Sequence, residues 1–98
     1  MAKIEKFEDL QVWQLAREIC HDLWTLFETT SLGKDYELKN QMSRSAGSIM
    51  DNIAEGFERN GTREFIQFLS ISKGSCGELK SQLYRTLDRK HITQEQFA

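Results

Sequence analysis

The sequence predicts an all-α fold, an antiparallel up-and-down four-helix bundle. The chain of 98 residues contains no proline and only six glycines, and proline is the residue that most strongly interrupts a helix. Three long segments repeat apolar residues at every third or fourth position, which is the spacing of one helical face. Since a chain of this length suits one domain, we expect residues 1–98 to form a single four-helix-bundle domain.

The overall composition argues for an ordered chain. Hydrophobic residues make up 39% and charged residues 29% of the sequence, close to the averages of globular proteins. The formal net charge of −2 argues against a generally basic nucleic-acid binder but is compatible with a local basic patch. No apolar stretch approaches the roughly 20 residues of a membrane span, and no signal peptide precedes Phe7, so we expect a cytoplasmic protein.

The first helix is expected over about residues 8–29, with Phe7 placed to pack on Val12 at its start. Its apolar residues form two neighbouring rows: Leu10, Trp13, Ala16, Cys20, Leu23 and Phe27 in one, and Val12, Leu15, Ile19 and Leu26 in the other. An apolar face this wide predicts cover on two sides, one from the bundle itself and one from something else.

The second helix is expected over about residues 35–58, with Asp35 as its N-cap, and the third over about 63–90, with Thr62 as its N-cap. The segment Arg59-Asn60-Gly61 between them predicts a left-handed stop and a tight antiparallel hairpin. Small residues gather in the middle of the third helix, which predicts the close approach of another backbone. These are Ser70, Ser72, Gly74, Ser75, Cys76 and Gly77.

A fourth helix is predicted near the end of the sequence. Thr93 and Gln96 have the spacing of a capping box, in which two residues satisfy each other's backbone N–H groups at the start of a helix. We therefore expect a fourth helix to begin near residue 93 and to be cut short.

The sequence offers no arrangement of residues that indicates catalysis. His21 and His91 stand alone, without a carboxylate or a second histidine at metal-ligand spacing, so both are expected at the surface. Cys20 and Cys76 are expected to be buried free thiols. No glycine-rich phosphate loop follows a strand. We expect no metal, no cofactor and no enzyme activity.

A polar stripe flanks the apolar row of the second helix, and a similar stripe follows the third. Its members are Gln41, Arg44, Ser48, Asn52 and Glu55 on the second helix, and Ser75, Glu78, Gln82, Arg85 and Arg89 on the third. In the predicted hairpin Arg44 meets Glu78 and Gln41 approaches Gln82. One interpretation is a solvated face. The other is a polar network that fixes the helix register or a subunit interface, centred on Gln41, Arg44, Ser48, Asn52, Glu55, Ser75, Glu78 and Gln82.

The same segments resemble a known family. Phe7 to Trp13, Gln41 to Ile49 and Asn52 to Gly56 are similar to the four-helix bundle family encoded in intervening sequences of bacterial large-subunit ribosomal RNA genes. Pairs such as Glu64-Phe65 and Glu78-Leu79 match its third helix, and the resemblance covers about residues 7–92. Two serines stand where that family often has alanine or another small residue, and the family's fourth helix is missing.

The resemblance implies a homo-oligomer, with a ring of five subunits, and no known catalytic activity. It also implies a relation to the accessory protein of diversity-generating retroelements, which binds a reverse transcriptase and nucleic acid. With three helices, the apolar rows that a fourth would cover are exposed, which favours association.

Two function hypotheses follow. In the first, an oligomeric scaffold contacts RNA or DNA through basic positions, whose repetition around a ring makes a multivalent surface. The candidate contacts are Arg59, Arg63, Lys73, Lys80, Arg85, Arg89 and Lys90. In the alternative, the chain is a protein–protein adaptor without a nucleic-acid role, and Trp13, Trp24 and Phe27 are either contact anchors or core residues.

Overall fold

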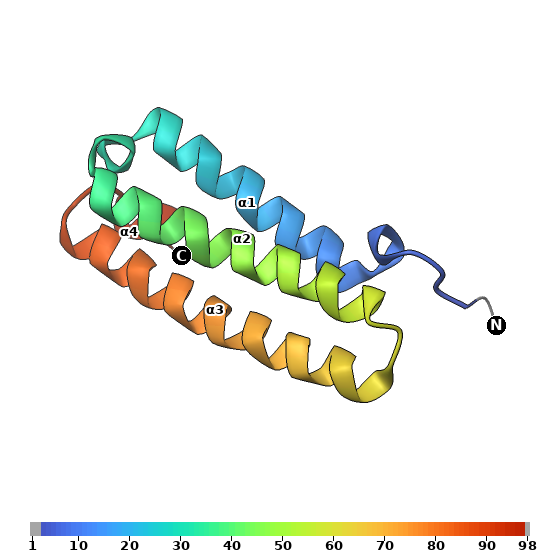
Figure 1. The fold of residues 1–98 in the computed structure, drawn as a ribbon. Helices are drawn as coiled ribbons and strands as arrows, with labels where there is room; N and C mark the ends of the chain where they lie inside the picture. The colour runs from blue at the N-terminus through green and yellow to red at the C-terminus, as the bar shows by residue number, and fades with distance from the viewer. Residues whose placement is uncertain (1–2, 98) are drawn as a thin grey trace.

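The computed structural model describes residues 3–97, and its regular structure within that range is entirely helical. The elements are the 3₁₀-helix η1 (Phe7–Asp9), α1 (Gln11–Thr29), the 3₁₀-helix η2 (Ser31–Lys34), α2 (Tyr36–Glu58), α3 (Thr62–Asp88) and α4 (Gln94–Phe97). The three long helices run antiparallel to their neighbours in sequence and form an elongated body of 46 × 21 × 20 Å (Figure 1). The predicted all-α bundle is confirmed, and its fourth helix is short.

The first helix begins three residues later than expected, at Gln11 instead of residue 8. Leu10 has an extended backbone (φ −73°, ψ 126°), which separates α1 from the short η1 turn. Phe7, expected to pack on Val12, places its ring edge-on against Trp13 with the ring centroids 5.2 Å apart. The aromatic contact therefore holds the entry to α1.

The connection between α1 and α2 confirms Asp35 as a helix cap. Thr30 Oγ1 accepts a hydrogen bond from the backbone N–H of Leu32 at the start of η2. One turn later, Asp35 Oδ1 accepts from the N–H of Leu38 at 3.4 Å. A carboxylate at this position also suits the positive end of the helix dipole.

The hairpin between α2 and α3 has the expected stop but a different cap. Asn60 adopts the left-handed conformation, with φ 63°, as expected at the end of α2. Thr62 is the first helical residue of α3, and Gly61 takes the cap position without a side-chain hydrogen bond. The helix starts one residue early because Gly61 already has the extended backbone of a cap (φ −139°, ψ 142°).

The third helix ends at Asp88, two residues before the expected boundary. Lys90 takes the left-handed conformation (φ 62°). The N–H of His91 donates to the carbonyl of Thr86 at 3.1 Å, and the N–H of Lys90 donates to that of Leu87 at 2.9 Å. These two bonds form a Schellman motif, which closes a helix and turns the chain. The capping box of Thr93 and Gln96 then starts α4, and both of its reciprocal hydrogen bonds are present.

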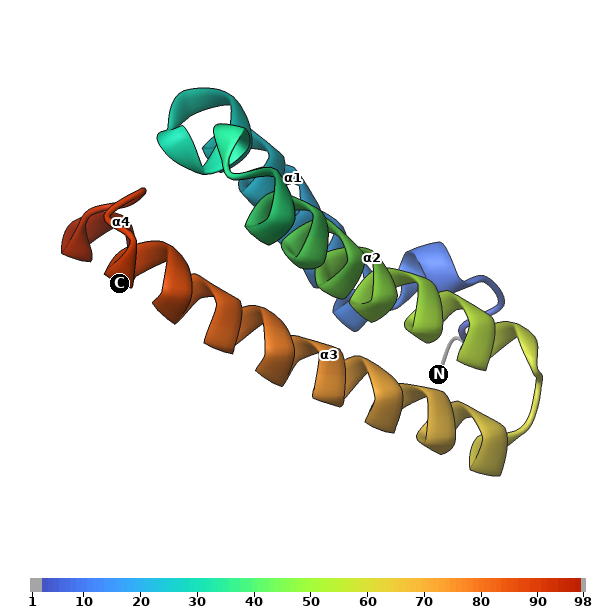
Figure 2. The same ribbon diagram turned by 60° about the vertical axis from the view of Figure 1, so that its left-hand side comes forward.

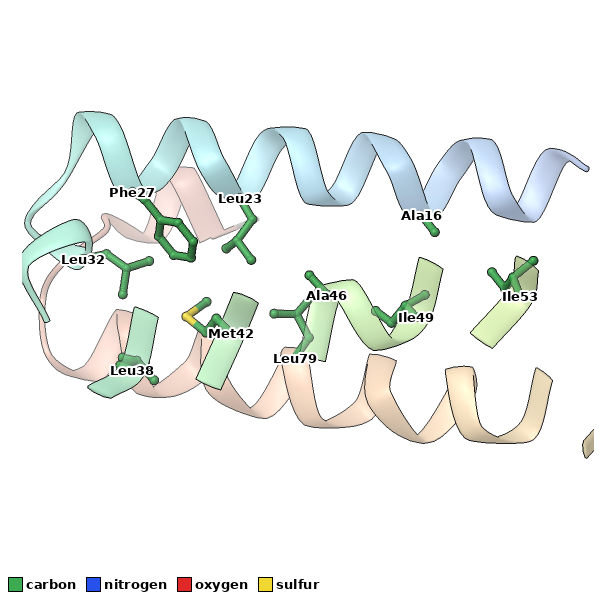
Figure 3. Close-up of a cluster of buried hydrophobic side chains, with 10 residues drawn as sticks. All are labelled: Ala16, Leu23, Phe27, Leu32, Leu38, Met42, Ala46, Ile49, Ile53 and Leu79. Carbon is green, nitrogen blue, oxygen red and sulfur yellow. The ribbon is translucent and has the colours of Figure 1, made fainter. Parts of the chain in front are cut away.

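The core lies between the three long helices, with α2 at the centre, packed against α3 along its length and against α1 (Figure 2). Ten buried residues form one cluster, drawn in Figure 3: Ala16, Leu23, Phe27, Leu32, Leu38, Met42, Ala46, Ile49, Ile53 and Leu79. Leu32, Leu38 and Met42 are completely buried. Half of this cluster comes from α2, which supplies Leu38, Met42, Ala46, Ile49 and Ile53.

Gly56 explains how closely α2 and α3 approach at the hairpin end. A Cβ atom added at Gly56 would lie 2.6 Å from Cβ of Phe68. Gly74 and Gly77 behave differently, because an added Cβ there would meet nothing within 4 Å. The expected close approach of another backbone at these two glycines is therefore wrong for the contacts within residues 3–97.

Three of the four residues in the second apolar row of α1 are exposed, whereas the fourth, Leu26, is half-buried against the core. Val12 is 47% exposed, Leu15 51% and Ile19 39%. With Ile49 and Ile53 as the floor and α3 as the opposite wall, Val12, Leu15 and Ile19 line an apolar groove of about 310 Å³. Along residues 3–97, no helix combines the length and apolar character needed to cross a bilayer.

Candidate functional site

A polar groove lies between α2 and α3, on the stripe that the sequence singled out. It is open to solvent and has a volume of about 460 Å³. Its lining residues are Gln41, Arg44, Ser45, Ser48, Glu78 and Gln82. The hairpin therefore brings together five of the eight predicted network residues in one groove.

A short chain of hydrogen bonds crosses the groove floor at Ser48. Its hydroxyl accepts from Asn52 Nδ2 at 3.0 Å and from the Ser75 hydroxyl at 2.9 Å. Beside it, the hydroxyl of Ser72 donates to the carbonyl of Ile49 at 2.9 Å. Small hydroxyl side chains let the two helices lie close together, and the two bonds from Ser75 and Ser72 to α2 fix the register between the helices.

The long side chains of the predicted network do not form the pairs that the sequence predicted. Within residues 3–97, neither Arg44 nor Glu78 forms an ion pair or a side-chain hydrogen bond, although both line the groove. Gln41 accepts from Arg85 Nη1 at 2.8 Å instead of pairing with Gln82. The interhelical contact falls one turn along α3 because the long arginine side chain reaches past the nearer residues.

Glu55 also departs from the predicted network. Its carboxylate pairs with Arg59 Nη2 at 2.8 Å, one turn later on the same helix, and both side chains are about half exposed. The i,i+4 spacing places these charges side by side without any contribution from α3. Glu55 therefore belongs to the solvated edge of α2.

Gln82 is the unusual member of the groove. Its residue is only 8% exposed, and its Oε1 atom is buried without a hydrogen-bond partner among the described residues. Most buried polar atoms in proteins have a partner, because leaving one unpaired costs about 1–3 kcal/mol. The sequence pattern placed Gln82 in the network but did not reveal this unpaired oxygen.

The seven candidate nucleic-acid contacts do not form one patch. Arg59 pairs with Glu55, Arg85 with Gln41, and Arg89 with Asp35 at 2.8 Å. The remaining four have no ion pair within the described range and are exposed: Arg63, Lys73, Lys80 and Lys90. Lys73 and Lys80 lie two helical turns apart on one side of α3.

A second polar cluster, which the sequence pattern did not predict, joins the start of α2 to the end of α3. The Ser31 hydroxyl lies 2.6 Å from His91 Nδ1, and His91 Nε2 lies 3.0 Å from Asp35 Oδ2. Arg89 donates to the same carboxylate oxygen. The hydrogen bonds from Arg89 and then from His91 lower the pKa of Asp35 to about 2.

The expected surface position of His91 is wrong, since its side chain is only 15% exposed. The left-handed turn at Lys90 folds the chain back and brings His91 to the start of α2. The sequence gives no sign of that turn, because glycine, the usual residue at such a position, is absent.

The cysteines are less buried than the sequence suggested. Cys76 is exposed, and Cys20 is half-buried with its thiol 3.5 Å from the carbonyl of Ala46. Burial, and to a smaller extent the charge of Asp51, raises the pKa of Cys20. Within residues 3–97, no group of three or more histidine, cysteine, aspartate or glutamate side chains is placed to hold a metal ion.

The aromatic residues of α1 divide between core and surface. Phe27 is buried, Trp13 is half-buried, and Trp24 is 53% exposed. The ammonium group of Lys39 lies 5.4 Å from the Trp24 ring centroid, and the guanidinium of Arg17 lies 5.8 Å from that of Trp13. These cation–π contacts cover part of each indole ring.

Comparison with known proteins places the chain in a family. Neither the curated proteins nor the solved structures include a significant match. A family model described as 23S rRNA-intervening sequence protein matches residues 8–98, which is most of the chain. The match includes the polar groove, the Asn-Ile-Ala-Glu-Gly segment with its tightly packed Gly56, and the beginning of α4. The chain therefore belongs to the family of 23S rRNA-intervening sequence proteins.

Proposed function

We propose that the chain is a homo-oligomeric helical scaffold without catalytic activity. The observation that carries this proposal is the apolar groove between α1 and α3. Three aliphatic side chains of α1 form one wall and remain 39–51% exposed. Contiguous exposed apolar surface of this kind marks interaction sites in proteins.

A second copy of the chain is the occupant that fits best. The exposed row of α1 (Val12, Leu15 and Ile19) is itself an apolar helical ridge, so each copy carries both a groove and a ridge that can fill one. Burying one such aliphatic side chain contributes about 1.5–3 kcal/mol at most. A ring of five subunits is the arrangement that the family resemblance implies.

The test is the native mass of the full chain at micromolar concentration, measured by light scattering after size exclusion. We expect the wild-type chain to run as an oligomer, and Leu15→Glu to shift it toward the monomer. Gln14→Glu is the matched control, because it adds the same charge at an exposed position of α1 outside the groove. A wild-type monomer would overturn the proposal.

Nucleic-acid binding is the second candidate function. Lys73 and Lys80 support it, because they share one side of α3 and no carboxylate pairs with either of them within residues 3–97. Ammonium groups in this position can contact successive phosphates and release counterions.

Fluorescence polarisation with a labelled single-stranded RNA, repeated over a salt series, tests this candidate. Each phosphate contact contributes a slope of about −0.7 in log K against log salt, so the Lys73→Gln, Lys80→Gln double variant is expected to flatten the slope by about 1.4. Lys34→Gln, another exposed lysine variant, serves as the control. If binding is absent at low salt, or does not depend on salt, nucleic-acid binding through these lysines is contradicted.

The absence of catalysis is also part of the proposal, although Ser31, His91 and Asp35 are arranged in a relay that resembles a hydrolase triad. Asp35 caps α2 and pairs with Arg89, which gives its carboxylate a structural use. Hydrolysis of an activated ester substrate distinguishes a structural role of this cluster from a catalytic one. We expect wild type and Ser31→Ala to hydrolyse it equally slowly, and a wild-type rate that falls in Ser31→Ala would establish a nucleophile.

A further inference from the structure

The apolar groove between α1 and α3 has charges of opposite sign along its two edges. On α1, Glu18 and Asp22 follow Leu15 by three and seven positions, so both lie on the side of the helix that carries Leu15. On α3, Lys73 lines the groove, and Lys80 follows it two helical turns later. All four charged side chains are exposed, and within residues 3–97 none of them forms an ion pair. One edge is therefore acidic and the other basic.

The acidic and basic edges stand at matching heights along the bundle. The helices α1 and α3 run in the same direction, since α2 is antiparallel to both (Figure 1). The groove is lined by residues between 12 and 19 on α1 and between 69 and 76 on α3, so the middles of these two stretches are level. At about 1.5 Å per residue, Glu18 lies within about 3 Å of the height of Lys73, and Asp22 within about 2 Å of the height of Lys80.

A second copy of the chain can fill this groove with its own α1. The apolar ridge of α1 and one wall of the groove are the same three side chains, Val12, Leu15 and Ile19. When the ridge of one copy enters the groove of another, the two ridges therefore meet each other. Such a self-complementary contact is isologous, and a two-fold axis relates the two copies.

The two-fold axis runs along the bundle, so the two α1 helices are parallel. In the opposite orientation, the α2 helix of the entering copy would fall where α3 already lies, because α2 packs beside both α1 and α3. An axis along the bundle leaves every residue at its own height. The acidic edge of each α1 then faces the basic edge of the other copy's α3, with Glu18 beside Lys73 and Asp22 beside Lys80.

We propose that two copies of the chain associate through this groove as a parallel two-fold dimer. The aliphatic ridges of the two α1 helices form its apolar seam, and the Glu18–Lys73 and Asp22–Lys80 ion pairs close the edges of the seam. Opposite charges at fixed heights also select this register, because a shift of one copy along the other separates them. The inference rests on the proposed self-association and adds to it the contact surface, the register and the symmetry.

Charge reversal tests the edges of the contact. The double variant Lys73→Glu, Lys80→Glu sets two acidic edges against each other, and Glu18→Lys, Asp22→Lys sets two basic edges against each other. Each is expected to raise the dissociation constant of the dimer at least about 10-fold, since one exposed ion pair contributes about 1.4- to 5-fold and the dimer contains several. An equimolar mixture of the two double variants should recover the wild-type affinity, because each acidic edge then meets a basic one. Sedimentation equilibrium without nucleic acid measures these constants.

Matched controls make the same charge changes away from the groove. Lys34→Glu with Arg63→Glu, and Glu28→Lys with Glu58→Lys, alter exposed positions that do not line it. Both control variants should keep the dissociation constant of wild type. Melting followed by circular dichroism checks that every variant is folded. Because nucleic acid is left out, the result is independent of any phosphate contact at the lysines of α3.

Disulfide formation tests the parallel orientation. In a chain with Cys20→Ser and Cys76→Ser, Val12→Cys and Ile19→Cys each place one thiol on the seam. Parallel helices bring each introduced thiol beside its own counterpart, so each variant is expected to form a covalent dimer under mild oxidation. Gln14→Cys, outside the groove, should remain uncoupled. Cross-linking only in a mixture of the Val12→Cys and Ile19→Cys chains would mean that the helices are antiparallel and would overturn the proposed dimer.

The remaining outcomes separate this inference from the self-association on which it rests. A wild-type chain that is monomeric at micromolar concentration would overturn both. An oligomer that neither charge reversal weakens would overturn the groove contact and leave self-association standing. A native mass of five copies would do the same, because a ring of five requires a head-to-tail contact in place of a two-fold one.

Discussion

His91 Nε2 lies 3.0 Å from Asp35 Oδ2, a contact between residues 56 positions apart in the sequence. It ties the turn after α3 to the first turn of α2, and the hydroxyl of Ser31 holds the other ring nitrogen. If the imidazole is neutral, Nε2–H donates to the carboxylate and Nδ1 accepts from Ser31, so one tautomer satisfies both partners. This cluster closes one end of the bundle.

Asp35 makes the stability of the fold sensitive to acid. Its pKa in the folded chain is about 2, below the ordinary value of 3.8. A depressed folded pKa contributes stability that is present above the unfolded value and lost as the pH falls through the folded value. We therefore expect the wild-type urea midpoint to fall between about pH 4 and pH 2, and Asp35→Asn to lack that part of the fall.

Asp22→Asn is the control for the acid series, because Asp22 is exposed on α1 and has no ion pair within residues 3–97. It should reproduce the wild-type pH dependence. An Asp35→Asn variant with the full wild-type fall would contradict the assigned role, since asparagine keeps the capping oxygen but removes the charge.

Two glycines of α2 predict opposite effects of the same substitution. At Gly56 the added methyl would collide with Cβ of Phe68, so Gly56→Ala must push α2 and α3 apart and is expected to cost about 1–3 kcal/mol. At Gly47 it meets nothing within 4 Å, and Gly47→Ala should add about 0.5–1 kcal/mol of stability through helix propensity. Urea unfolding of the two variants in parallel measures both, and equal changes would disprove the close approach at Gly56.

Two leucines test the boundary of the core in the same way. Leu32 is completely buried, and Leu32→Ala is expected to cost about 2–5 kcal/mol because it leaves a cavity. Leu15 is 51% exposed, and Leu15→Ala should change the unfolding free energy by only about 0.5 kcal/mol at low protein concentration. A large loss at Leu15 under dilute conditions would mean that the groove is covered within a single copy.

The long helices and the caps at Asp35 and Thr93 were predictable because their signals are local, whereas Thr62 was predicted as the cap of α3 and Gly61 takes that position. Apolar spacing gave the three long helices, Asp35 has the side chain of an N-cap, and Thr93 with Gln96 has the spacing of a capping box. The left-handed turn at Lys90 has no such signal, since lysine is not a usual residue there. Without that turn, the contact between His91 and Asp35 could not be foreseen.

The groove was predictable in outline and not in detail. Hairpin register follows from the position of Asn60, so the contact between Ser48 and Ser75 was within reach of the sequence. Long side chains such as Arg44 and Arg85 can reach several partners within one helical turn, and the rotamer that each adopts depends on all the neighbouring side chains. Helix spacing therefore locates the stripe but does not decide which of its members form pairs.

The two thiols should react at very different rates. Cys76 is exposed at the edge of the apolar groove, whereas Cys20 is half-buried and has a raised pKa because of its burial. Thiolate is the reactive form, so a thiol reagent at neutral pH should modify Cys76 quickly and Cys20 slowly. In Cys76→Ser only the slow reaction should remain, and in Cys20→Ser only the fast one.

If a second copy fills the groove, the fast reaction should slow as the chain is concentrated, and this protection should be lost in Leu15→Glu. Equal rates for both thiols would contradict the placement of Cys20, and a rate at Cys76 that is independent of concentration would contradict self-association through this groove.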